Sequence, residues 1–398
     1  MSRRALMLIL LFTLVFAALH FYIGLHGWWF LEALQAGLPQ GVYWPLLALV
    51  ALAYVLARVL ERYLPYPVFY MLKVVGSYWL GLLMYAVLLL PLADLAALAL
   101  RLAGVPASTS VPLLGWIVVG ALLAVLILGS LAAWRPVVRR YEASIAKPAG
   151  KLRSLRVVVA SDLHLGTIMR NRQLRRFVER VNALQPELIL LPGDILDDDL
   201  RPFVEQQMAA TMRGLKAKYG VYAVLGNHEY IGGQPDEFAR LMQEEAGVEM
   251  LLDRTVRVAE GVYISGRKDR SADAPRFGGG RLPLERLLAD VDPRAPIILL
   301  DHQPYHLDQA AAAGVDVMLS GHTHRGQLAP NHLITRRLFE LDWGYLRKGS
   351  LHAIVSSGYG FWGPPLRIGS RAELIELTLR FAHEEQADED ADVRGVTE

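Results

Sequence analysis

Residues 221–229 read Val-Tyr-Ala-Val-Leu-Gly-Asn-His-Glu, an apolar run that ends at a glycine and is followed by an amide, an imidazole and a carboxylate. Four more apolar runs are followed by polar side chains in the same way: Asp162 and His164 after 155–160, Asp194 after 188–191, His302 after 297–300, and His322 and His324 after 315–319. Short apolar runs of this kind predict strands that are covered on both faces. Because open α/β sheets bind ligands beyond the carboxyl ends of their strands, we expect these side chains to meet at one site.

The segments around these runs predict a mixed α/β domain. Two further strands are expected at 353–356 and 374–379. Between the first two strands, apolar residues recur at helical spacing and predict the buried face of a helix: Leu174, Phe177, Val178, Val181 and Leu184. Strand, helix and strand in this order predict a βαβ unit with a right-handed crossover.

The polar side chains at the strand ends offer oxygen and nitrogen ligands of the hard-to-borderline kind. Such ligands suit Mn, Fe or Zn and disfavour copper(I). They are too numerous for one tetrahedral zinc ion, so two metal ions that share one carboxylate are the economical interpretation. The chain has no cysteine, which excludes a disulfide scaffold, an iron–sulfur cluster and a cysteine nucleophile.

The order of these motifs resembles one known family. Asp-x-His at 162–164, Gly-Asp at 193–194, Gly-Asn-His-Glu at 226–229, a lone histidine at 302 and Gly-His-x-His at 321–324 are similar to the motifs of calcineurin-like metallophosphoesterases, over about residues 155–380. Residues 320–327 and 357–367 resemble the membrane-associated bacterial branch, which includes enzymes similar to UDP-2,3-diacylglucosamine pyrophosphatases. The front end resembles the animal transmembrane protein with a metallophosphoesterase domain. The resemblance implies a four-layer α/β/β/α sandwich.

The same resemblance implies a role for each site residue. Asp162, His164 and His324 would bind one metal ion, and Asn227, His302 and His322 would bind a second. Asp194 would bridge the two ions, for which manganese is favoured over iron and zinc. His228 would lie beside the phosphate as the catalytic residue, and with Asn227 it would contact the substrate.

Several neighbouring side chains admit two interpretations. Arg325 either clamps phosphate or lies solvated at the rim of the site. Three histidines match no metal position and are expected to be surface or core residues: His306, His332 and His352. Candidate hydrogen-bond acceptors for the ligand imidazoles are Asp197, Glu229 and Asp301. Six aromatic residues would line an apolar groove or simply pack in the core and loops: Tyr230, Trp343, Tyr345, Tyr359, Phe361 and Trp362.

The expected activity is hydrolysis of a phosphoester or pyrophosphate bond. Two divalent ions about 3.5–4 Å apart lower the pKa of a bridging water and hold hydroxide at neutral pH. They also offset the charge that develops in the transition state, and a protonated His228 would assist the leaving group. Membrane attachment favours a lipid-linked substrate. The alternative is a membrane sensor or scaffold that keeps the fold without catalysis; the complete ligand set and His228 favour the enzyme.

The first third of the chain has the composition of a membrane domain. Of the 80 charged residues in the chain, nine lie between Met1 and Trp134. Four apolar stretches there are long enough to cross a bilayer as helices, which needs about 20 residues: 5–25, 42–60, 72–92 and 112–134. His20, His26 and Asp94 lie near the expected membrane ends and are interpreted as interfacial polar residues.

The distribution of Lys and Arg predicts the orientation. Positive residues are concentrated at the N-terminus, between the second and third spans, and in residues 135–153, all on one side of four spans. The positive-inside rule therefore places the N-terminus and the catalytic domain in the cytoplasm. A twin-arginine export signal at Ser2-Arg3-Arg4 is the alternative.

The expected domain organisation follows from these boundaries. Residues 1–134 form the transmembrane domain, 135–153 a basic juxtamembrane linker, 154–382 the metallophosphoesterase domain and 383–398 a disordered acidic tail. The formal net charge of +2 gives no basic surface that would favour nucleic acid as a partner. Membrane lipid and a phosphoester, which includes a nucleotide-lipid, are the expected partners.

Overall fold

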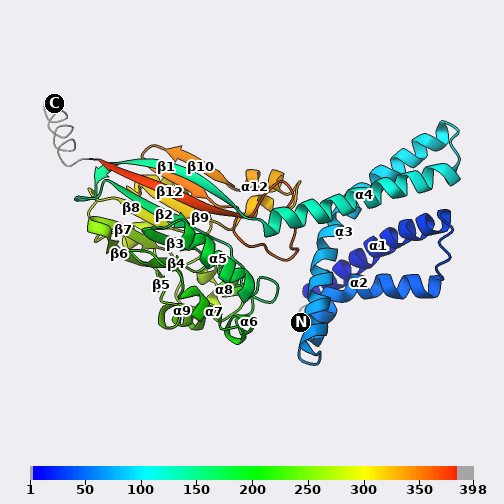
Figure 1. Ribbon diagram of the computed structural model, residues 1–398, viewed down its shortest axis with the longest axis horizontal. Helices are drawn as coiled ribbons and strands as arrows, with labels where there is room; N and C mark the ends of the chain where they lie inside the picture. The colour runs from blue at the N-terminus through cyan, green and yellow to red at the C-terminus, as the bar shows by residue number, and fades with distance from the viewer. Residues whose placement is uncertain (1–2, 383–398) are drawn as a thin grey trace. The chain divides into compact units, whose positions relative to one another are not determined.

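The computed structural model describes residues 3–382 and divides them into two compact units (Figure 1). The first unit contains residues up to Leu131 together with Gly363–Leu366. The second contains Ala132–Trp362 and continues from Arg367. The acidic tail expected at 383–398 lies outside the described residues.

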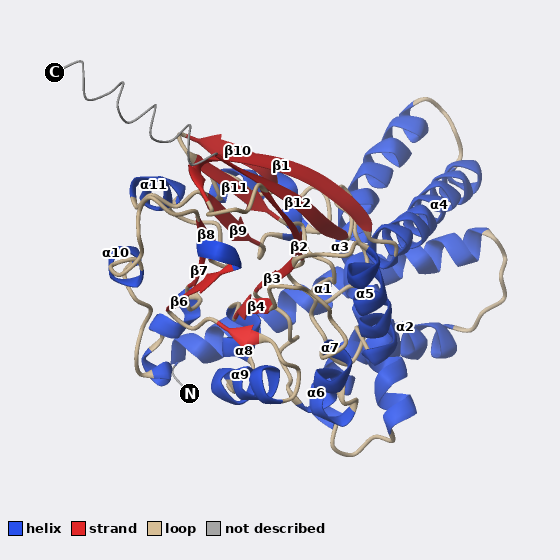
Figure 2. Ribbon diagram, turned by 60° about the vertical axis from the view of Figure 1, so that its left-hand side comes forward, coloured by secondary structure: helices blue, strands red, loops and turns tan. Residues whose placement is uncertain are grey.

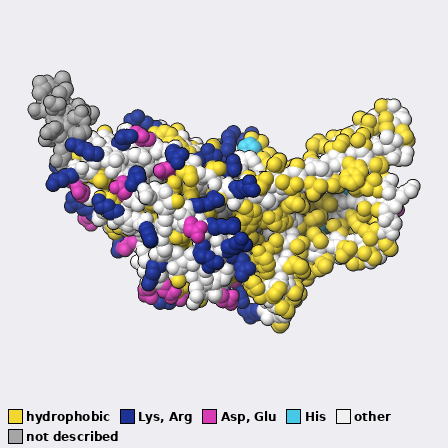
Figure 3. All heavy atoms as spheres, viewed as in Figure 1, with side chains coloured by type: hydrophobic (Ala, Val, Ile, Leu, Met, Phe, Trp, Pro, Cys, Tyr) yellow, Lys and Arg dark blue, Asp and Glu magenta, His cyan; other side chains and the backbone are white. Residues whose placement is uncertain are grey.

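The first unit is built from helices that are long and apolar enough to cross a membrane. They are α1 (Arg3–Ala33), α2 (Gln40–Leu60), α3 (Tyr66–Leu102) and α4 (Ala107–Trp134), whose last residues belong to the second unit. Each of the four expected spans lies inside one of these helices. Their outward side chains, such as Phe12 and Leu128, are more than half exposed. Figure 3 shows hydrophobic side chains gathered over these helices, a surface that requires lipid around it.

The second unit contains two six-stranded sheets. The first sheet contains β1 (Val137–Pro148), β2 (Ser154–Val159), β3 (Leu188–Pro192), β4 (Val221–Val224), β5 (Glu249–Met250) and β12 (Glu373–Ala382). The second contains β6 (Arg254–Val258), β7 (Val262–Gly266), β8 (Ile297–Leu300), β9 (Val317–Ser320), β10 (Gly344–Lys348) and β11 (Leu351–Val355). Their strand orders are β1-β12-β2-β3-β4-β5 and β10-β11-β9-β8-β7-β6. The four central strands of the second sheet, and β2 to β5 in the first, run parallel.

Within residues 3–382, six helices cover the outer faces of the sheets. Those on the first sheet are α5 (Asn171–Ala183), α6 (Arg201–Glu205), α7 (Met208–Met212) and α9 (Pro235–Glu244), and those on the second are α10 (Leu284–Leu287) and α11 (Leu307–Ala312). Two further helices in this range are α8 (Asn227–Ile231), directly after β4, and α12 (His332–Leu338). Short 3₁₀ turns are η1 (Ala259–Gly261), η2 (Arg270–Asp273), η3 (Pro275–Phe277) and η4 (His324–Gly326). Figure 2 shows the strands in red, with α5 and α7 beside the first sheet and α10 and α11 beside the second.

Alternating side chains along the strands show that the unit has four layers. Val157 and Val159 of β2 pack with Ile298 of β8 in a core between the sheets. The intervening Val158 faces the other way and packs with Phe177 of α5. On the far side, Ile297 and Leu299 of β8 pack against α10 and α11. This confirms the α/β/β/α sandwich and the buried helix face predicted at 174–184.

One expectation about the connection to the membrane helices is wrong. Residues 135–153 were expected to be a basic linker, but residues 137–148 form β1, which pairs in parallel with β12 along almost its whole length. Arg139 and Arg140 pair with Glu373 and Glu376 of β12. The basic charges of this segment therefore contribute to pairing within the sheet. The other expected strands form within one or two residues of their predicted ends, except that β12 is longer.

Candidate active site

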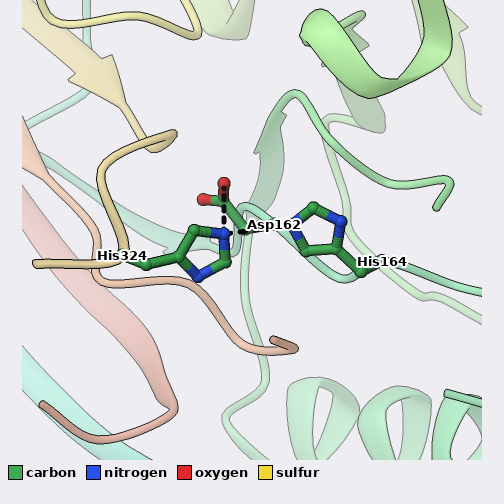
Figure 4. A group of neighbouring side chains, drawn as sticks. All are labelled: Asp162, His164 and His324. Atoms are coloured by element: carbon green, nitrogen blue, oxygen red, sulfur yellow. Dashed lines mark hydrogen bonds and ion pairs between the residues drawn. The ribbon is translucent and has the colours of Figure 1, made fainter. Parts of the chain in front are cut away.

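The first group of donor side chains consists of Asp162, His164 and His324. Asp162 and His164 follow β2, and His324 lies in η4 just after β9 (Figure 4). His324 Nε2 lies 3.0 Å from His164 Nε2 and 3.4 Å from Asp162 Oδ1. One ligand atom from each residue lies within 4.8 Å of the others, the spacing that one metal ion could bridge. The three residues predicted to bind the first ion are therefore brought together.

The second group lies at the ends of β3, β4, β8 and β9. His302 Nε2 lies 3.1 Å from Asp194 Oδ2 and 3.2 Å from Asn227 Oδ1. His322 Nδ1 lies 2.8 Å from the same Asn227 oxygen. Asp194 also groups with His164 of the first set. All seven candidate ligands thus converge, and Asp194 lies between the two sets, as a shared carboxylate must.

Tight backbone geometry makes this convergence possible. Asp162, His164, Asp194, His322 and His324 all have positive φ, a conformation that is rare for non-glycine residues and clusters at functional sites. A Cβ on Gly226 would collide with the Asp194 carboxylate, and one on Gly321 with that of Asp162. The glycines that precede Asn227 and His322 are therefore needed to admit the two carboxylates.

The donor set fits divalent metal ions. Asp162 and Asp194 are buried, and burial of a carboxylate is costly unless it is paired or binds a metal. Burial raises the pKa of Asp162. Burial also opposes ionisation of Asp194, but the charge of His302 and its hydrogen bond outweigh this and lower the pKa of that carboxyl.

Two of the ligand imidazoles are held in the neutral form in which a histidine binds a metal ion, whereas for His302 the Asp194 carboxylate outweighs the effect of burial and raises the pKa. Burial lowers the pKa of His322 to about 4 and that of His324 well below its usual range, so both rings are neutral at pH 7. The Pro192 carbonyl lies 2.9 Å from His302 Nδ1 and accepts its hydrogen, which leaves Nε2 to face Asp194 and Asn227. A metal ligand is typically oriented in this way by a hydrogen bond to its other ring nitrogen.

His228 is held by a carboxylate that our sequence interpretation missed. Its Nδ1 lies 2.7 Å from Asp198 Oδ1 and 3.9 Å from Asp197. Asp197, which was expected to accept from a ligand imidazole, lies 3.7 Å from His164 Nδ1. Burial alone would lower the pKa of His228, but the hydrogen bond to Asp198 and the nearby carboxylates raise it to about 9. The run Asp197-Asp198-Asp199, which begins three residues after Asp194, was the available signal.

Two other expected acceptors have different partners. Glu229 accepts the backbone N–H groups of Leu196 and Gly226. Asp301 is buried and pairs with Arg267 and Arg281. Both carboxylates therefore stabilise loops around the site, and the expectation that they accept from ligand imidazoles is wrong.

Arg367 is a second site residue whose role the sequence did not reveal. Its side chain is 1% exposed, and its Nη2 lies 3.1 Å from His324 Nδ1. The same guanidinium donates to the carbonyls of Gly358 and Gly360. It thereby ties the ring of His324 to the loop that follows β11.

Comparisons with known proteins show the family to which this chain belongs. Residues 155–326 match the family model described as calcineurin-like phosphoesterase. An uncharacterized metallophosphoesterase of Aquifex aeolicus is 33% identical over 232 residues, which is 57% of this chain and 85% of that protein. The chain belongs to the calcineurin-like metallophosphoesterase family.

A second relative is named as a transmembrane protein. The transmembrane protein with metallophosphoesterase domain of Bos taurus is 31% identical over 263 residues, which is 63% of this chain. The match spans 59% of the bovine protein's length. Among solved structures, a dimetal phosphatase from Danio rerio is 12% identical, with a TM-score of 0.34, over 51% of this chain and 87% of that one.

Arg325 and the three histidines that match no metal position each have different surroundings in the structure. The Arg325 guanidinium stacks 4.0 Å over the ring of Trp343, a cation–π contact that neither expectation anticipated. His352 is buried between β10 and β1, as expected for a core residue. His306 is exposed and His332 partly exposed, and neither joins a metal-like group within residues 3–382.

The six aromatic residues do not form one groove. Tyr359 packs on Phe177 and Phe361 on Trp134, both in the core of the second unit. Trp362 differs because it is 58% exposed and its ring centroid lies 6.1 Å from that of His228. Ordinary packing therefore accounts for the buried members, and Trp362 is an exposed aromatic side chain beside His228.

Proposed function

We propose that this protein is a membrane-anchored phosphoester hydrolase with a two-metal centre. The observation that carries the proposal is the His228–Asp198 pair, which lies beside two convergent sets of metal-binding side chains. A scaffold that had lost catalysis would have no need to hold an imidazole as a proton donor next to a complete ligand set.

The ligand roles follow from the two groups. Asp162, His164 and His324 hold one ion. Asn227, His302 and His322 hold the second, and Asp194 is shared. Manganese suits these oxygen and nitrogen ligands. When bound, such ions lower the pKa of a water molecule and offset negative charge on a phosphoryl group.

His228 supplies the proton that the leaving group needs. Asp198 accepts the Nδ1 hydrogen, so the second proton of the charged ring sits on Nε2. With a pKa of about 9 the ring is protonated at neutral pH and can donate to the departing oxygen. Because Asn227 directs its amide oxygen toward His302 and His322, its amide nitrogen is left to donate to a phosphoryl oxygen.

The surroundings support an amphiphilic, lipid-linked substrate. Trp362 presents an exposed apolar ring next to His228, where the leaving group of a phosphoester would lie. The membrane helices keep the enzyme among lipids. Together these features favour a phosphoester or pyrophosphate with an apolar portion over a small soluble phosphate.

The test is hydrolysis by the full-length protein in detergent, loaded with manganese. The panel contains alkyl and aryl phosphomonoesters, nucleotide diesters and lipid pyrophosphates, and the control is Asp194→Asn, which should lose both metal and activity. We expect hydrolysis, with the highest kcat/KM on a lipid-linked member. A wild-type protein that holds two ions per chain and cleaves none of the panel would establish the scaffold alternative instead.

A further inference from the structure

A cavity lies within the membrane unit, between α1, α3 and α4. Its volume is about 340 Å³, within the range of about 300–1,000 Å³ that is usual for ligand pockets. Its walls are formed by apolar side chains such as Phe30, Leu90 and Val118. Among the lining residues, His26 and Asp94 are the two that can ionise.

His26 and Asp94 belong to a hydrogen-bonded cluster that includes Tyr22. His26 Nε2 lies 2.8 Å from Asp94 Oδ1, and the Tyr22 hydroxyl donates to Asp94 Oδ2 at 2.5 Å. The other ring nitrogen, His26 Nδ1, lies 2.9 Å from the Tyr22 carbonyl oxygen. The cluster connects α1 with α3 at the edge of the cavity.

The hydrogen-bond capacity that remains in this cluster is that of an acceptor. A carbonyl can only accept, so His26 Nδ1 carries a hydrogen and donates it to Tyr22. One proton then lies between His26 Nε2 and Asp94, and the Tyr22 hydroxyl hydrogen is already donated. Asp94 keeps two of its four lone-pair sites, and its side chain is 50% exposed.

His20, in the same unit, is a histidine whose two ring nitrogens both have hydrogen-bond partners. Its Nδ1 donates to the Phe16 carbonyl at 2.7 Å, and its Nε2 accepts from Trp79 Nε1 at 2.9 Å. The residue is 8% exposed. His20 therefore has a structural role, whereas the cluster around Asp94 keeps free acceptors at the wall of a cavity.

We propose that this cavity binds a lipid with an apolar chain and a neutral head that carries hydroxyl groups. The apolar walls suit the chain, and the free acceptors of Asp94 suit a head that donates hydrogen bonds. His26 and Asp94 share one proton and have no net charge together, so a neutral hydroxyl is favoured over an ammonium, whose burial without a counter-charge is costly. This site is separate from the catalytic residues and does not depend on the proposed hydrolysis.

The test compares two lipids with the same chain. Monooleoylglycerol carries two hydroxyl groups, and methyl oleate has none. Binding of each to the full-length protein in detergent is measured by native mass spectrometry. We expect wild type to prefer monooleoylglycerol by about tenfold, the value of one net hydrogen bond. Equal binding of the two lipids to wild type would mean that only unspecific lipid fills the cavity, and would overturn the proposal.

Substitutions at Asp94 reduce the number of free hydrogen-bond acceptors in steps. Asp94→Leu removes them and should abolish the preference. Asp94→Asn keeps one acceptor beside His26 and Tyr22 and should give an intermediate value. A preference that stays at the wild-type level in both variants would contradict the role of Asp94.

Two substitutions on α4 test the cavity without touching the polar cluster. Val119 lines it, whereas Leu123 is exposed on the same helix outside the lining. Val119→Trp should weaken binding of monooleoylglycerol at least tenfold, and Leu123→Trp should not. Equal effects of the two substitutions would place the lipid elsewhere, and this pair keeps the proposal testable if an Asp94 variant fails to fold.

Discussion

His228 is the side chain in the site that we assign to the substrate and not to a metal ion. We predict that His228→Gln keeps both ions while kcat falls by about 10²–10⁴, the usual contribution of a general acid. The loss should be smaller for an aryl than for an alkyl phosphate, because an aryl leaving group needs little protonation. Metal analysis beside kinetics on both esters checks this.

Substitution of Asp198 tests the same role of His228 and should have a smaller effect on activity. It acts through its 2.7 Å contact with His228 Nδ1, so Asp198→Asn should retain both ions and lose less activity than His228→Gln. If His228→Gln released a metal ion, or cleaved both esters at the wild-type rate, His228 would be a ligand or a bystander.

Arg367 should control the affinity of the first metal position. Its guanidinium fixes the His324 ring through Nδ1, and loss of such outer contacts typically weakens metal binding by 10–100-fold. We predict a loss in that range for Arg367→Met at one of the two ions, measured by metal titration. The exposed Arg371 is the matched control, and Arg371→Met should bind both ions as wild type does. Equal losses in the two variants would remove the specific role of Arg367.

The residues at the strand ends could be found from sequence because each one follows an apolar run. Asp194 and His302 are recognisable in this way. The Pro192 carbonyl that orients His302 could not be found, because a backbone acceptor leaves no trace in residue type. Assigning Asp198 to His228 required the turn geometry after β3, which a run of three aspartates does not specify.

At the scale of elements, strand β1 could not be predicted from the sequence because its many charged residues also fit a linker. Its side chains alternate between exposed and more buried positions, and the exposed positions include Arg140 and Glu142, as is usual for an edge strand. Lys147 near its end also reaches Asp316, next to the second sheet, at 2.8 Å. A segment that follows a membrane helix and is rich in Lys and Arg matches a juxtamembrane linker equally well, and only its pairing with β12 decides between them.

The two sheets are joined by His352, and this contact should depend on pH. His352 Nε2 donates to the Ser144 carbonyl of β1, and the Tyr345 hydroxyl donates to Nδ1, so the ring is neutral. Burial lowers the pKa of His352 in the folded protein. Below the unfolded value of about 6.5, only the unfolded state takes up the proton, so this stabilisation is present above pH 6.5 and is lost as pH falls toward the folded pKa.

We predict that His352→Gln reduces the loss of stability between pH 8 and pH 5. Glutamine can make both hydrogen bonds and does not titrate. The reduction should be about 1.4 kcal/mol for each pH unit over which only the unfolded wild type is protonated. Denaturant unfolding of the full-length protein in detergent measures it, with His306→Gln, an exposed position, as the control. A wild-type pH dependence in His352→Gln would exclude this role.

At the scale of the whole molecule, the open question is which side of the membrane carries the second unit. If all four apolar helices cross the membrane, the N-terminus and the second unit lie on the same side. Positive residues near the membrane on that side include Arg58, Arg62 and Lys73 between α2 and α3, while the short connections between α1 and α2 and between α3 and α4 have almost none. The formation of β1 does not remove the bias, because its basic residues still lie just after α4.

We therefore predict that a reporter fused after Glu398 reads as cytoplasmic. The same reporter placed at Gly37, between α1 and α2, should read as extracytoplasmic, because that connection lies one span away from the N-terminus. A matched fusion at Gly104, between α3 and α4, should agree with it. An extracytoplasmic reading after Glu398 together with a cytoplasmic reading at Gly37 would invert the whole topology. An extracytoplasmic reading after Glu398 with Gly37 unchanged would mean that one helix does not span, and would turn the phosphoesterase site toward the outer leaflet.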